Sequence, residues 1–94
     1  MDEKIYVLGP EKSGKTTFIQ QYFRSIQNFS TIIESNEKII PEDSVMTYVI
    51  LPRPNLLRQR NPEIQDPNTI IAEWMKFYYE LSAKTKTLLI EEDI

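Results

Sequence analysis

Glycine is scarce in this chain, and its placement constrains the fold more than any other feature of the sequence. The 94 residues include only two glycines, Gly9 and Gly14, whereas an average composition of about 7% would supply about six or seven. Both fall in one short segment, residues 9–16, which reads GPEKSGKT. Because glycine is the residue that most readily adopts positive φ or allows close backbone approach, we expect a sharp turn or a close approach to the backbone in this segment.

The residues on either side of this turn predict regular structure. Residues 5–8 (IYVL) form a short continuous apolar run, which is typical of a strand buried on both faces of a parallel sheet. Residues 15–27 place apolar side chains at helical spacing, with polar side chains mostly on the other face. The apolar positions are Phe18, Ile19, Tyr22, Phe23 and Ile26. The turn therefore joins a buried strand to an amphipathic helix.

This segment matches G-x-x-x-x-G-K-[ST], the P-loop or Walker A motif. In such a loop, backbone N–H groups and the helix N-terminus surround phosphate oxygens. The lysine at position 15 would reach the β- and γ-phosphates, and the hydroxyl of Thr16 would bind Mg²⁺. The sequence thus predicts a phosphate site that comprises Gly9, Pro10, Glu11, Lys12, Ser13, Gly14, Lys15, Thr16 and Thr17.

The rest of the chain completes a single α/β domain over residues 1–94. Strands are predicted at residues 31–33, 45–51 and 88–90, and a helix at 70–81, begun by Asp66 as N-cap and Pro67. Residues 36–44 are expected to form a loop, and the proline-rich residues 52–67 a long one. We therefore expect a P-loop fold with a mostly parallel sheet of about four strands and flanking helices.

Composition excludes several chemistries and locations. The chain has no cysteine and no histidine, which rules out disulfides, zinc or haem ligation and Ser-His or Cys-His catalysis. A net charge of −3 gives no strong signal for nucleic acid. The sequence has no apolar run of the ~20 residues needed to span a bilayer, and its acidic start does not resemble a secretory signal. An intracellular protein is expected.

Two further segments resemble the Ras/Rab-type small GTPases. Residues 80–85 (ELSAKT) resemble the family's E-x-S-A-K-T segment, and residues 45–60 resemble its strand leading to N-K-x-D. The resemblance implies a shortened Ras-like G domain that binds GTP or GDP with Mg²⁺. It also implies candidate base-binding residues, namely Asn55, Ser82, Ala83 and Lys84. The guanine-binding aspartate is replaced by Asn55, and the chain has no D-x-x-G, so weak or absent hydrolysis is expected.

A second alignment with the same family competes with the first. Trp74, Tyr78 and Tyr79 also resemble the Arf/Rab helix that follows D-x-x-G, and residues 52–55 would then stand in place of that motif. The first alignment requires a strand and a base loop over residues 77–85, whereas the second requires a helix there. The sequence leaves both open.

Two other classes of function remain. Residues 87–93 (TLLIEED) resemble a Walker B strand of a P-loop ATPase or kinase that binds ATP or ADP, with Glu91 and Glu92 as its acids. Such folds place a further strand between this one and the P-loop strand, which the chain is expected to lack. Alternatively, the protein is a non-catalytic pseudo-GTPase scaffold that holds a protein partner through an exposed sheet edge. Arg53, Arg58 and Arg60 could contact an acidic partner or a phosphate, but solvated loop charges are the preferred interpretation.

Overall fold

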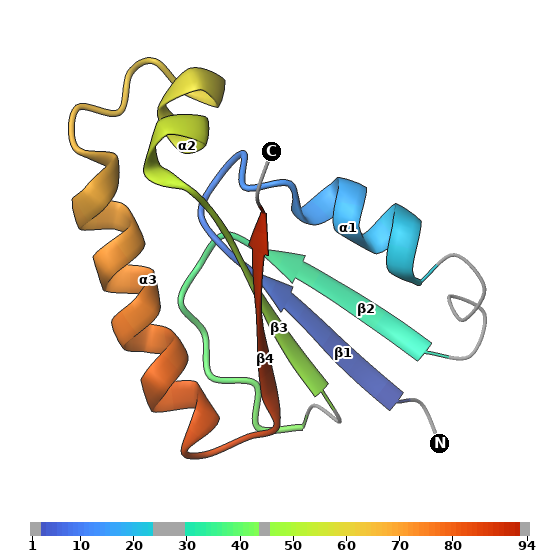
Figure 1. Ribbon diagram of the computed structural model, residues 1–94. Helices are drawn as coiled ribbons and strands as arrows, with labels where there is room; N and C mark the ends of the chain where they lie inside the picture. The colour runs from blue at the N-terminus through green and yellow to red at the C-terminus, as the bar shows by residue number, and fades with distance from the viewer. Residues whose placement is uncertain (1–2, 24–29, 44–45, 93–94) are drawn as a thin grey trace.

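The computed structural model describes residues 3–23, 30–43 and 46–92 of the chain. These residues form an α/β fold in which a four-stranded, fully parallel sheet carries helices on both faces (Figure 1). In chain order, the elements are β1 (Glu3–Leu8), α1 (Lys15–Tyr22), β2 (Ser30–Ser35), β3 (Met46–Pro52), α2 (Pro54–Arg60), α3 (Pro67–Ser82) and β4 (Thr87–Glu92). The strand order across the sheet is β2-β1-β3-β4, which confirms the predicted parallel sheet of about four strands.

Strands β1 and β3 occupy the centre of the sheet, as their apolar sequences predict. Successive side chains of a strand point to opposite faces, and the register pairs Leu8 with Val49. Both residues are fully buried. The first residue of the predicted strand 45–51, Val45, lies outside the described residues. The continuous apolar runs thus report strands covered on both sides.

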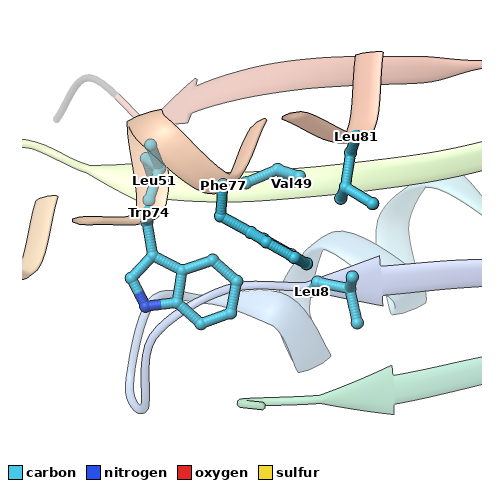
Figure 2. Close-up of a cluster of buried hydrophobic side chains, with 6 residues drawn as sticks. All are labelled: Leu8, Val49, Leu51, Trp74, Phe77 and Leu81. Carbon is cyan, nitrogen blue, oxygen red and sulfur yellow. The ribbon is translucent and has the colours of Figure 1, made fainter. Parts of the chain in front are cut away.

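Helix α3 covers one face of the sheet. Trp74, Phe77 and Leu81 each follow the last by three or four positions and form one helix face, which packs on the strands (Figure 2). The Trp74 and Phe77 rings meet edge to face, with centroids 5.6 Å apart. Beneath them lie Leu8 and Val49. The aromatic stripe of residues 70–81 is therefore core, and its helix lies where the sequence predicts it.

Helix α1 covers the opposite face with a second cluster. Phe18 and Phe23 pack against Val7 and Ile50, which alternate in their strands with the residues under α3. The sequence predicts this helix over residues 15–27, whereas it ends at Tyr22. Residues 24–29 lie outside the described part of the chain. The fold thus has three layers, with α1 and α3 on opposite sides of the sheet (Figure 1).

The predicted long loop over residues 52–67 is wrong in its first half, where α2 runs from Pro54 to Arg60. Pro54 occupies the first turn of the helix, where its missing N–H costs no helical hydrogen bond. Leu57 is fully buried and anchors the helix. Pro54 thus begins a helix instead of preventing one. The predicted start of α3 is confirmed, because Asp66 accepts a hydrogen bond from the Thr69 backbone N–H at 3.3 Å.

The connection between β2 and β3 crosses the sheet without forming a helix or strand over residues 36–43, as expected. Asp43 ties it to β1, because its carboxylate accepts from Lys4 Nζ at 2.6 Å and from the Tyr6 hydroxyl at 3.0 Å. Ser44 lies outside the described residues. Among the helices of the described segments, none has the length and apolar character that crossing a membrane requires.

Candidate functional site

Residues 9–14 connect β1 to α1 at the carboxyl edge of the sheet. The chain leaves β1 toward β2 on one side and leaves β3 toward β4 on the other, so the direction of winding reverses between β1 and β3. In open α/β sheets, ligands bind in the crevice outside the carboxyl ends of the strands at such a switch point. The topology therefore places the two glycines where this class of fold places its ligands.

The two glycine positions of this loop each disfavour a side chain, for separate reasons. A Cβ atom at Gly9 would lie 2.5 Å from the Ile50 carbonyl oxygen and 2.8 Å from Ser13 Oγ. Gly14 has a φ of 96°, in the region that side chains disfavour. Lys12 also adopts positive φ, at 63°, and the Ser13 N–H closes the turn by donating to the Pro10 carbonyl at 3.2 Å. The loop is thus tightly wound and pressed against β3.

The side chain of Lys15 folds back beneath this loop. Lys15 is only 7% exposed, and its Nζ donates to the carbonyls of Gly9 at 3.0 Å and Pro10 at 2.7 Å. Ser13 Oγ lies 3.4 Å from the same nitrogen. Burial lowers the pKa of Lys15, while the charges of Glu34 and Glu11 act in the opposite direction. A positive charge is therefore held inside the loop by oxygen acceptors.

The N-terminus of α1 points into the same region. Gly14 is its N-cap, and among the described residues no side chain accepts a hydrogen bond from the first turn. By contrast, the Asp66 carboxylate caps α3. An uncapped first turn leaves backbone N–H groups and the positive end of the helix dipole available to an anion. Thr16 and Thr17 in that turn are exposed.

A cavity of about 480 Å³ opens beside the loop. Three cationic side chains and one carboxylate line it, together with small polar groups. Its lining residues are Lys12, Ser13, Gly14, Lys15, Thr16, Thr17, Glu34 and Arg60. Six of the nine residues predicted for phosphate binding therefore share one cavity. Gly9 and Pro10 contribute through their carbonyls, which hold Lys15, and Glu11 lines a neighbouring cavity.

Two residues of this cavity lie outside the predicted phosphate site, and one of them, Glu34, is not predicted at all. Glu34 Oε1 accepts a hydrogen bond from the Thr16 hydroxyl at 2.8 Å, and Arg60 Nη1 donates to the Lys12 carbonyl at 3.3 Å. Arg60 is therefore a contact of the loop and not a solvated loop charge, because α2 carries it back over residues 9–14. Glu34 pairs in register with Val7 of β1. Its position near the carboxyl end of a neighbouring parallel strand is the signal that could have found it.

The candidate base-binding residues do not join this cavity. Ser82 ends α3, and Ala83 and Lys84 follow it in the turn before β4. This turn lies at the amino edge of the sheet, where Lys86 accepts from the Thr47 N–H at 3.0 Å. One strand length, about 20 Å, separates it from the loop. The alignment that required a strand and base loop over residues 77–85 is wrong, because α3 occupies most of that segment.

Asn55 lies on the same edge of the sheet as the loop but faces a different cavity. It belongs to the first turn of α2, and it lines a space of about 670 Å³ with Asp66 and Asn68, among others. None of residues 9–17 lines that space. The four candidate base-binding residues are therefore distributed over two regions, neither of which includes the loop.

Glu91 of β4 does approach the loop. It lines a smaller cavity of about 240 Å³ with Gly14 and Thr17. Strand β3 lies between β1 and β4, so the intervening strand that the chain was expected to lack is present. The side chain of Glu92 lies outside what the structure describes. Within the described residues, no group of three or more acidic side chains gathers closely enough to hold a metal ion.

Comparison of the chain with models of known protein families, with curated proteins and with solved structures finds no match. The geometry of residues 9–17 and of the cavity beside them is therefore the basis for proposing a function. This geometry combines a buried ammonium group, an uncapped helix N-terminus and a cation-rich cavity.

Proposed function

We propose that the protein binds a nucleoside triphosphate or diphosphate through residues 9–17, as a P-loop protein resembling a shortened Ras-like GTPase. The observation that carries the proposal is the buried ammonium of Lys15, held by the Gly9 and Pro10 carbonyls at the uncapped start of α1. A buried cation of this kind is costly unless oxygen atoms surround it. A phosphate group supplies such oxygens with the opposite charge.

The residues present fit both a phosphate chain and Mg²⁺. The first-turn N–H groups of α1 would donate to phosphate oxygens, and Lys15 would exchange loop carbonyls for the β- and γ-phosphates. Arg60 and Lys12 add positive charge to the same cavity. Mg²⁺, held by the Thr16 hydroxyl and the phosphates, would neutralise charge on the phosphate oxygens.

We expect weak or absent hydrolysis. Strand β3 pairs with β1, which is the position from which a D-x-x-G segment would supply a metal-linked acid and a phosphate-sensing N–H. In this chain, residues 52–55 read PRPN. They offer no carboxylate, and the two prolines have no N–H to donate. The base preference for GTP rests on the resemblance at residues 80–85, which lie away from the loop, so GTP and ATP are to be compared directly.

Isothermal titration with GTP, ATP and their diphosphates, with and without Mg²⁺, tests the proposal. Lys15→Ala should weaken binding by about 10- to 100-fold, because charge-assisted hydrogen bonds are worth about 1.5–3 kcal/mol. Lys86→Ala is the matched control, since it removes an exposed lysine at the opposite edge and should leave affinity unchanged. Unchanged affinity in Lys15→Ala, or no binding by the wild-type chain, contradicts the proposal.

A P-loop ATPase or kinase is the second candidate, favoured by the position of Glu91 beside Gly14 and Thr17. An acid there would polarise water or bind a metal ion. This candidate requires preferential binding of ATP and its turnover, with turnover lost in Glu91→Gln while affinity is retained. If no nucleotide binds and Lys15→Ala keeps the fold and its protein contacts, the chain is instead a scaffold that uses an edge of its sheet.

A further inference from the structure

Among the residues that the structure describes, Glu34 is the one carboxylate that contacts Thr16, the loop residue assigned to the metal. Its Oε1 accepts from Thr16 Oγ1 at 2.8 Å, and its charge acts on Lys15. It belongs to β2, which pairs with β1 in parallel register, so it arrives at the carboxyl edge from the strand on the far side of β1 from β3. The cavity beside the loop is thus lined by one carboxylate as well as by three cationic side chains.

This carboxylate conflicts with a phosphate site unless a cation lies between them. Lys12, Lys15 and Arg60 make the cavity attractive to an anion, whereas Glu34 would repel the same phosphate oxygens at short range. A divalent cation removes the conflict, because it binds carboxylate and phosphate oxygens at once. Mg²⁺ is usually held by one or two carboxylates together with substrate phosphates, so a large cluster of acids is not required.

The residues that follow β3, the strand next to β1, offer no carboxylate that could serve as an alternative to Glu34 as a metal ligand. Strand β3 ends in Pro52 and continues to Arg53, where a metal-linked carboxylate would otherwise follow the strand next to β1. Glu91, at the end of β4, shares a cavity with Gly14 and Thr17 but not with Thr16. Glu11 lies in the cavity next to the loop, and the structure shows no hydrogen bond from Thr16 to it. Among the described acids, Glu34 therefore has the direct contact.

We infer that Glu34 and Thr16 together form the protein's half of a divalent-cation site, with the phosphates of the ligand as the other half. The Thr16 oxygen can donate its proton to Glu34 and still offer a lone pair to a cation. The acid that accompanies the metal in this protein would thus come from β2 instead of β3. This inference rests on the proposed nucleotide binding and assigns the metal requirement of that site to a named residue.

The test compares nucleotide affinity in excess Mg²⁺ with affinity in EDTA, measured by titration of the full chain with GTP and with ATP. In the wild-type protein, Mg²⁺ should strengthen binding. In Glu34→Gln, the ratio of the two affinities should fall by about 10- to 100-fold, which is typical for loss of a metal-orienting carboxylate. In EDTA, the affinity of Glu34→Gln should be equal to or higher than that of the wild type, because the substitution removes a charge that repels the phosphates. A change confined to metal-dependent affinity also separates this role from a folding defect.

Glu37→Gln is the matched control, because it removes an acid that lines the neighbouring cavity near Glu34 and should keep the wild-type Mg²⁺ ratio. Glu91→Gln tests the competing assignment of the metal to the acid of β4, and the inference requires that this variant also keep the ratio. An unchanged ratio in Glu34→Gln, or a ratio lost in Glu91→Gln instead, overturns the inference while nucleotide binding stands. If the wild-type chain binds neither nucleotide in either condition, both the proposed function and this inference fail.

Discussion

The contact between Gly9 and β3 sets the shape of the loop at the scale of a single residue. The Gly9 Cα lies so close to β3 that an added methyl group would meet the Ile50 carbonyl oxygen at 2.5 Å. That oxygen belongs to a central strand and cannot move aside without disturbing the sheet. Gly14 differs, because its requirement is positive φ and not space. Sequence spacing identified both glycines, but only the structure separates these two reasons.

Gly9→Ala should therefore destabilise the fold by about 1–3 kcal/mol, the usual cost of forcing extra volume into a packed site. Urea unfolding of the variant and the wild type measures this difference. Thr17→Ala, an exposed change in the same region, is the control and should stay within about 0.5 kcal/mol. A Gly9→Ala protein as stable as the wild type would show that the loop is free to shift away from β3.

The buried ammonium of Lys15 gives the protein a predictable alkaline pH dependence. Burial lowers the pKa of Lys15 in the folded state, so the charged form opposes folding at all pH values below that folded pKa. As pH rises from the folded pKa toward the higher unfolded one, this cost disappears. Relative to Lys15→Met, the wild-type free energy of unfolding should therefore increase in this alkaline window. Urea unfolding of both proteins across the window provides the measurement, and a constant or falling difference contradicts it.

At the scale of elements, a helix can be predicted when the residues that determine it lie close together in the sequence. Helix α3 is predictable because Asp66 and Pro67 mark its start and a long apolar stripe follows them. Helix α2 is missed because two prolines flank its start and only Leu57 is fully buried. In so short a helix, one buried apolar residue does not produce the repeated apolar spacing by which a helix is predicted. The position of Pro54 at the start of the helix, and not the number of prolines, decides the structure.

Helix α2 contributes to the site through its last residue. Arg60 reaches the Lys12 carbonyl and lines the cavity beside the loop, whereas Arg58 of the same helix lines the cavity around Asn55. Arg60→Ala should therefore weaken triphosphate binding by about three- to tenfold, in line with a hydrogen bond worth about 0.5–1.5 kcal/mol. Arg58→Ala is the matched control and should have no effect. Equal losses in both variants, seen by titration, would assign the effect to net charge alone.

At the scale of the whole molecule, the fold class is predictable and the composition of the cavity is not. Continuous apolar strands alternating with helical stripes indicate a parallel α/β sheet, and the structure has one. Glu34 and Arg60 join the loop only because β2 lies beside β1 and α2 brings Arg60 to the Lys12 carbonyl. Such neighbours are separated by many positions in sequence and carry no motif. Conversely, Ser82 and Lys84 belong to a segment that resembles E-x-S-A-K-T, yet they lie at the amino edge of the sheet, away from residues 9–14.

The contacts of residues 9–14 also link the loop, β3 and α2 into a closed series of contacts. Gly9 abuts the Ile50 carbonyl in β3, β3 leads almost directly into α2, and Arg60 at the end of α2 returns to the Lys12 carbonyl. Loop, strand and helix are thus joined end to end through the chain and through space. A displacement of residues 9–14 would therefore have to be accommodated by a shift of β3 or α2, or by loss of the hydrogen bond from Arg60.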